Sequence, residues 1–174
     1  MLKKTVLCGA LAFAFFAPLT SIADSQSDKK ITTEIEALYA KSLALKSSKI
    51  AVMASDNNVS LKGDLTTDMQ YEEAVALAQS VSDVTDVKAD ELKVKESKAP
   101  MADTYITAKV KGMLMKEKLF GSKAVDYWPV NIETKDSVVY LSGKVDTEEQ
   151  VKNIENIAKS INGVKSVSSN ITVK

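Results

Sequence analysis

The chain has 174 residues, and its 23 basic residues balance 23 acidic residues, so its formal charge at neutral pH is zero. Every cation is a lysine, and the sequence contains no histidine. Sequence-reading nucleic-acid binders depend on the arginine fork, and nonspecific ones usually carry a basic excess. The composition therefore predicts no nucleic-acid partner.

The first residues predict a secretory signal peptide, residues 1–23. Two lysines precede residues 5–19, which are apolar and uncharged, and residues 21–23 supply the small side chains of a cleavage site. A membrane anchor is the alternative, but the apolar stretch contains Pro18 and is shorter than the ~20 residues that span a bilayer. We therefore expect export, cleavage after Ala23, and no transmembrane segment in the mature protein.

The single cysteine, Cys8, lies inside the apolar stretch rather than at its end. A lipoprotein signal places its cysteine at the end of the stretch, after small residues, so we expect no lipid anchor. Cleavage would leave residues 24–174, which contain no cysteine and hence no disulfide. That length is enough for one domain or two small ones.

An internal repeat runs through the rest of the chain. The segment VSLKGDLTTDMQ, residues 59–70, shares most of its pattern with VVYLSGKVDTEEQ, residues 138–150, at an offset of 80 positions. The matched pairs are Val59 with Val139, Leu61 with Leu141, Gly63 with Gly143, Leu65 with Val145, Thr67 with Thr147 and Gln70 with Gln150.

The hydrophobic periodicity predicts one order of elements in both copies, which is helix, strand, strand, helix, strand. In the first copy the elements are expected near residues 31–38, 50–52, 59–65, 71–81 and 87–94. In the second copy they are expected near residues 104–119, 130–134, 139–145, 147–161 and 167–173.

Several helix ends carry capping signals. Thr147 and Gln150 form a capping box, which Thr67 and Gln70 repeat in the first copy. Asn162 and Gly163 form a C-terminal cap of the helix that begins at Thr147. Asp103 or Thr104 is expected to cap the first helix of the second copy.

A strand that reaches the next strand through a helix lies parallel to it, whereas a tight turn makes two strands antiparallel. The predicted fold class is therefore α+β, with two tandem αββαβ domains. Each is a small mixed three-stranded sheet with two helices on one face. The domains are expected at residues 28–95 and 103–174, with a linker at residues 96–102.

Glycines at equivalent places set further expectations. Gly63 and Gly143 stand where a side chain would face the helices, so we expect a close backbone approach there, with a β-bulge as the alternative. Asp83 stands where the second copy has Gly163, which makes the first copy the degenerate one.

The pattern VxLxGxV, a capped helix and then INGVKSVxxNITV at residues 161–173 resembles the BON domain family. The resemblance covers both copies. It implies an αββαβ fold, a periplasmic location and a role in contacting phospholipid surfaces or envelope proteins, without enzymatic activity.

Side chains with catalytic chemistry are scarce. Without histidine, and without cysteine after cleavage, the sequence contains no nucleophile–histidine pair and no usual zinc site, and its six glycines form no phosphate loop. We expect no enzyme, no cofactor and no metal. Acidic residues gather at Asp83, Asp86, Asp90 and Glu91; a weak calcium site is one reading, and a solvated acidic edge is the favoured one.

Charge differs between the copies, with net −4 over residues 24–99 and net +2 over residues 103–174. The first helix of the second copy carries four lysines around an apolar back face, and the loop after it contains aromatic residues. This combination is typical of contact with anionic phospholipid. The predicted lipid-binding or partner-binding residues are Lys109, Lys111, Met115, Lys116, Lys118, Leu119, Phe120, Tyr127 and Trp128.

Two alternatives stay open. Met115 and Leu119 could pack on the first domain, while Trp128 closes the end of a small core. A chaperone-like periplasmic module is the second functional hypothesis, because the exposed edges of two small sheets could accept a strand from an unfolded or outer-membrane protein.

Overall fold

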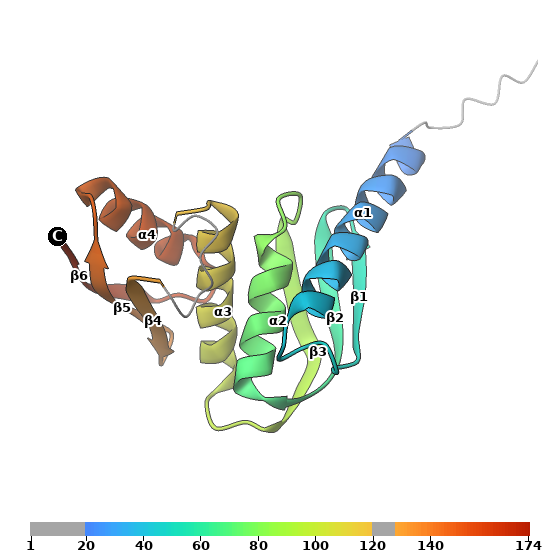
Figure 1. Ribbon diagram of the computed structural model, residues 1–174, viewed down its shortest axis with the longest axis horizontal. Helices are drawn as coiled ribbons and strands as arrows, with labels where there is room; N and C mark the ends of the chain where they lie inside the picture. Colours follow the sequence, from blue (N-terminus) through green and yellow to red (C-terminus); the bar gives the residue numbers. More distant parts are fainter. Residues whose placement is uncertain (1–19, 120–127) are drawn as a thin grey trace, which may run out of the picture.

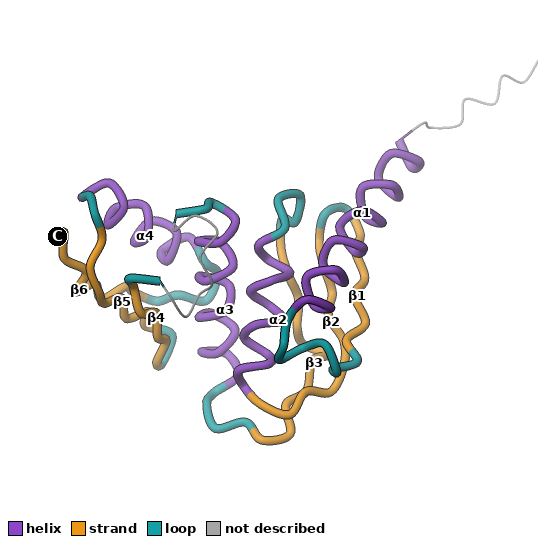
Figure 2. The backbone as a smooth tube through the Cα atoms, in the orientation of Figure 1, coloured by secondary structure: helices purple, strands orange, loops and turns teal. Residues whose placement is uncertain are grey.

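The computed structural model describes residues 20–119 and 128–174, with side chains from residue 26 onward. Helices and strands alternate in the predicted order in both halves (Figures 1 and 2). The first half contains α1 (Thr20–Lys41), β1 (Ile50–Ser55), β2 (Asn58–Thr67), α2 (Asp68–Ser80) and β3 (Asp86–Glu96). The second half contains α3 (Met101–Lys116), β4 (Val130–Lys135), β5 (Val138–Val145), α4 (Glu148–Ser160) and β6 (Ser166–Val173).

The two sheets confirm the predicted fold class. Their strand orders are β1-β2-β3 and β4-β5-β6. β1 and β4 run antiparallel to the next strand, whereas β3 and β6 run parallel to the middle strand. Figure 1 shows the two helices of each half on one face of its sheet. The predicted signal peptide lies outside the described residues except for residues 20–23, which belong to α1.

Each β-hairpin closes through a two-residue turn in which both residues have positive φ. The values are 52° and 63° at Asp56 and Asn57, and 52° and 65° at Asp136 and Ser137. Turns of this kind match the right-handed twist of the paired strands. The tight turn predicted for each copy is therefore confirmed.

The N-cap predicted for α3 is wrong. The helix begins at Met101, after Pro100, and its first turn has no side-chain cap. The Asp103 carboxylate accepts hydrogen bonds from the backbone N–H groups of Asp136 and Ser137, both at 2.9 Å. Asp28 of α1 binds the turn of the first half in the same way, at 3.2 Å for both bonds. In both halves an aspartate thus fixes the first helix to the hairpin.

The capping box of α4 is confirmed. The Thr147 hydroxyl accepts the Gln150 backbone N–H at 3.2 Å, and the Gln150 side chain accepts the Thr147 backbone N–H at 3.3 Å. In α2 the threonine half of the box is present, because Thr67 accepts the N–H of Gln70. The Gln70 side chain instead accepts the N–H of Thr66. Gln150 also accepts the equivalent N–H of Asp146 at 2.9 Å, so the two copies differ only in the bond from the Thr147 N–H.

The glycines of β2 and β5 permit a close backbone approach, but not to the helices. A Cβ on Gly143 would lie 2.1 Å from the Pro129 carbonyl oxygen, and one on Gly63 would lie 2.4 Å from that of Lys49. The approaching residue comes directly before the paired antiparallel strand, and this corrects the expected neighbour. Both glycines also have positive φ, 136° and 158°.

Apolar side chains form two cores, and α3 contributes to both. Ile106, Val110 and Leu114 are buried in the second core. Ala108 belongs to the first core, and Tyr105 packs against it. Figure 1 shows α3 standing between α2 and the second sheet. The two halves therefore share one helix at their boundary. No helix in residues 20–119 and 128–174 is long and apolar enough to cross a bilayer.

Replacing Gly143 by alanine tests the close approach. The added Cβ would overlap the Pro129 carbonyl, and the backbone would keep a φ that L-residues disfavour. We expect a loss of about 2–4 kcal/mol in the free energy of unfolding, measured by urea denaturation. The Lys144→Ala variant changes the next, exposed side chain and should cost less than about 0.5 kcal/mol. Equal midpoints for the two variants would contradict this account of the glycine.

Candidate binding site between the two halves

The two halves meet where α3 packs on α2 at Gly112. A Cβ at this position would lie 2.6 Å from the Cβ of Gln79 and 2.7 Å from the carbonyl oxygen of Ala76. Side-chain carbons do not approach other atoms this closely, so glycine lets the α3 backbone lie against α2. Ala76 and Gln79 are buried in this contact.

The three lysines of α3, which are Lys109, Lys111 and Lys116, are all bound by the first half. The Lys109 ammonium pairs with Asp86, and its side chain is 8% exposed. Lys111 pairs with Glu72 of α2. The Lys116 ammonium donates to the carbonyl of Val84 at 2.7 Å. These ammonium groups lie at the boundary of the two halves, where they are partly shielded from water.

Tyr105 adds a fourth polar contact to the boundary. Its hydroxyl donates to the carbonyl of Val87 on β3, and the Lys109 ammonium lies 5.6 Å from the centre of its ring, within the range of a cation–π contact. Burial, followed by the charge of Asp86, raises the pKa of Tyr105 to about 12. The hydroxyl therefore stays protonated as a donor at neutral pH.

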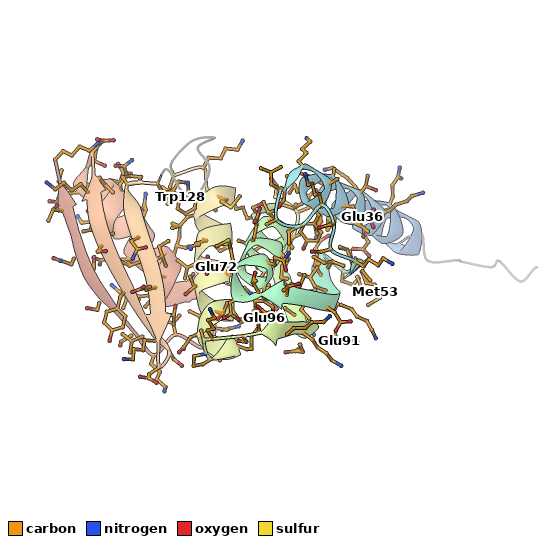
Figure 3. All side chains as sticks on the ribbon, turned by 60° about the horizontal axis from the view of Figure 1, so that its bottom comes forward. Glu36, Met53, Glu72, Glu91, Glu96 and Trp128 are labelled. Carbon is orange, nitrogen blue, oxygen red and sulfur yellow. The ribbon has the colours of Figure 1, made fainter. Side chains whose placement is uncertain are left out.

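The predicted lipid-binding residues are thus not gathered on one free face. Lys118 is exposed and Met115 is partly buried. Leu119 and Trp128 are partly buried against the second core, and Figure 3 shows Trp128 beside the end of α3. Phe120 and Tyr127 lie outside the described residues. Lipid binding by this set stays a prediction, and the ammonium groups of three of its lysines already have partners within the chain.

Three of the acidic residues that cluster in the sequence of the first half form ion pairs with different lysines. Asp83 pairs with Lys30 at 2.9 Å, and Glu91 pairs with Lys62 at 2.7 Å. Asp86 is the partner of Lys109. Within the described parts of the chain, no group of three or more possible metal ligands occurs. The acids act as partners of lysine ammonium groups.

A groove, here called the β4 groove, runs along the outer edge of β4. One part has a volume of about 800 Å³ and lies between α2, α3 and β4. A second part of about 380 Å³ continues along β4 towards Trp128 and Gly143. Lys111, Asn131 and Ile132 line both parts. The groove therefore follows the strand from one end to the other.

The walls of the β4 groove mix hydrogen-bonding and apolar groups. Thr107 on the floor donates its hydroxyl to Thr134 at 2.7 Å, and the pair of Lys111 and Glu72 lies on the side of α2. Tyr140, 46% exposed, lies at the opposite side. β4 is an edge strand, and alternate residues of such a strand direct backbone N–H and C=O groups away from the sheet. The edge of β4 therefore presents backbone hydrogen-bonding groups beside the groove.

Two small mixed sheets, each covered by two helices and joined through a shared helix, define a tandem αββαβ protein. The chain belongs to the BON domain family, which matches residues 27–96 and 102–174. Over 161 residues it is 33% identical to the osmotically-inducible protein Y of Escherichia coli, covering 90% of this chain and 77% of that protein.

Two further comparisons give weaker likenesses. A protein in the gshII 5′ region of Anaplasma centrale is 29% identical over 133 residues, covering 73% of this chain and 83% of that protein. The C-terminal domain of CdsD, a type III secretion structural protein of Chlamydia trachomatis, has a TM-score of 0.34 at 15% identity, covering 84% of this chain and 67% of that one. The similarity to CdsD is too low to carry information about function.

Sequence reasoning missed the boundary and the groove for a common reason. Both depend on how α3 meets the first half, and the repeat pattern describes each half separately. One local signal was available, because Gly112 lies in the middle of a helix where glycine costs stability. A second was the alanine-rich α2, with Ala74, Ala76 and Ala78, which suits close helix packing.

A substitution of Lys109 tests the boundary. Lys109→Met keeps the apolar stem, removes the ammonium and leaves Asp86 without its partner. We expect a loss of about 1–3 kcal/mol in the free energy of unfolding, measured by urea denaturation. Lys118→Met, at an exposed position just after the same helix, should change it by less than about 0.5 kcal/mol. If both variants unfold at the wild-type midpoint, Lys109 does not stabilise the boundary.

Proposed function

We propose that the protein is a non-enzymatic periplasmic binding protein that holds an extended segment of an unfolded envelope protein against β4. The observation that supports this most is the β4 groove. It joins an unpaired strand edge to walls from both halves. An added strand would gain backbone hydrogen bonds from β4, and its side chains would meet the walls.

The edge of β3 in the first half, which corresponds to β6, is less open to a strand. The edge of β3 is partly covered by α3, because Tyr105 donates to the carbonyl of Val87 there. Ala89 and Leu92 of β3 are buried as well. Of these two edges, β4 is therefore the more open one for a client strand.

The physiological setting follows from the relatives and from the start of the sequence. The relative in Escherichia coli is described as osmotically inducible, and the first 23 residues have the pattern of a secretory signal. We therefore place the binding function in the periplasm under osmotic or envelope stress.

Site-specific cross-linking tests the β4 groove. A photo-cross-linker is attached to Asn131→Cys in the groove, or to Met53→Cys, which is 52% exposed on the first sheet. Cys8 is replaced by serine in both. Each labelled protein is mixed with a urea-denatured outer-membrane protein in lipid-free buffer. We expect adducts and suppressed aggregation, with several-fold more adduct from position 131. Equal yields, or no adduct at either position, would contradict the proposed site.

Contact with anionic phospholipid is the second candidate function. It rests on Lys118, which is exposed beside Leu119 at the end of α3, with Trp128 close by in Figure 3. An ammonium group beside half-buried apolar side chains suits a membrane surface. This surface is smaller than the sequence predicts, because the lysines of α3 face the first half.

Vesicle co-sedimentation at low salt tests the lipid surface. Lys118→Glu should reduce binding to anionic phospholipid vesicles roughly fivefold or more, because each lysine near such a surface contributes ~1 kcal/mol. Lys144→Glu makes the same change of charge on the second sheet, and we expect it to leave binding nearly unchanged. Equal binding by the wild type and the Lys118→Glu variant would exclude this surface.

A further inference from the structure

One surface of the first half is covered by α3, whereas the equivalent surface of the second half is not covered by any helix of the described residues. Asp28 and Asp103 perform the same role, so an offset of 75 positions relates α1 to α3. An offset of 80 positions relates α2 and the start of β3 to α4 and the start of β6. The surface of α2 and β3 that receives α3 therefore has a counterpart on α4 and β6. Among the described elements, none covers that counterpart from outside (Figure 1).

Exposure of equivalent side chains shows the difference. Val84 and Val87 are fully buried in the first half, and Lys116 and Tyr105 of α3 donate to their carbonyls. Val164 and Val167 stand at the same positions of the second half and remain partly exposed. The apolar surface of α4 and β6 is thus incomplete in the single chain, and the first half shows what completes it, which is a helix of the α3 type.

A helix of that type is free at the other end of the molecule. The four helices follow one another in a row, with α1 at one end and α4 at the other (Figure 1). The outer side of α1 carries Thr33, Glu34, Glu36 and Ala37, all exposed. These residues correspond to Ala108, Lys109, Lys111 and Gly112 of α3, which meet the first half. Figure 3 shows Glu36 on α1, far from the second sheet.

On the two free surfaces, one charged pair has the opposite signs to the equivalent pair in the contact between α2 and α3. Within the chain, Lys111 of α3 pairs with Glu72 of α2. Glu36 occupies the place of Lys111 on α1, and Lys152 occupies the place of Glu72 on α4. Both residues are exposed. The pair is thus kept with its signs exchanged, so each free surface complements the other.

A neighbouring contact follows the same pattern in part. Glu34 takes the place of Lys109, and the acid that Lys109 binds, Asp86, is replaced by Ser166, which removes a repulsion with Glu34. Lys41 retains the lysine of position 116. Lys116 donates to the backbone carbonyl of Val84, and Val164 stands at the equivalent position of the second half.

We propose that α1 of one copy docks onto α4 and β6 of a second copy, with Glu36 of the first facing Lys152 of the second. The contact repeats between chains the packing of α3 on α2 within a chain. It does not depend on the proposed function, because it uses neither the β4 groove nor Lys118.

Two sequence differences between the copies weaken this contact relative to that between α2 and α3. Ala37 stands at the place of Gly112, and Asn156 stands at the place of Ala76. Larger side chains at both positions keep the helices farther apart than α2 and α3, so less apolar surface is buried. We therefore expect a weak association that becomes visible at high protein concentration.

The geometry also determines the kind of assembly. The docking surfaces lie on different elements, so each copy keeps one free surface after binding. Such a head-to-tail contact forms open chains unless the rotation between copies closes a ring. Because the helices lie in a row, we expect open chains and species larger than dimers.

Sedimentation velocity on variants with exchanged charges tests the proposal. Purified wild-type protein at low salt, at concentrations up to about 1 mM as suits a transient contact, should show a sedimentation coefficient that rises with concentration. Glu36→Lys alone and Lys152→Glu alone should each lose this rise, because the facing residues then carry like charges. An equimolar mixture of the two variants should regain it.

Lys144→Glu is the matched control, because it makes the same charge change on an exposed site outside the contact. It should associate as the wild type does, and thermal unfolding should show that all variants are folded. Three results would each overturn the proposal: a wild type that stays monomeric throughout, a mixture that does not regain association, and a control that loses as much as Lys152→Glu.

Discussion

The contact between α2 and α3 at Gly112 is the constraint on which the rest of the structure depends. Because a glycine lets the two helices approach so closely, α3 can serve two cores with its two sides. Ile106 and Val110 face its own sheet, whereas Ala108 is buried against the first half. A chain that reads as two separate repeats is thereby joined through one helix, and small domains gain from such shared burial.

That contact also decides which surfaces are left for partners. It takes up the lysines of α3 and part of the edge of β3. It leaves the edge of β4 beside a groove with walls from both halves. It has no equivalent at α4 and β6, where the second repeat ends. The proposed client site and the proposed self-association both follow from this single asymmetry between two otherwise similar units.

The repeat and its turn chemistry were sufficient to predict the αββαβ order, the mixed sheets and the capping box at Thr147, because these depend on neighbouring residues. The site was predicted less well. The sequence predicts that the lysines of α3 form a free basic face, since it does not show that Glu72 and Asp86 lie opposite them. Asp103 is predicted to cap a helix. Its hydrogen bonds instead reach a turn more than 30 residues away, which the local sequence does not reveal. Long-range partners are what a local pattern does not contain.

The distance between the two sheets tests the central claim most directly. Spin labels at Met53→Cys and Tyr140→Cys, both on exposed sheet positions, would report it by pulsed dipolar spectroscopy with Cys8 replaced by serine. If α3 holds the halves together, the distribution is a single narrow peak, and Gly112→Leu broadens it. A broad distribution in the otherwise wild-type protein would show two domains tethered by a flexible linker, and would contradict the account.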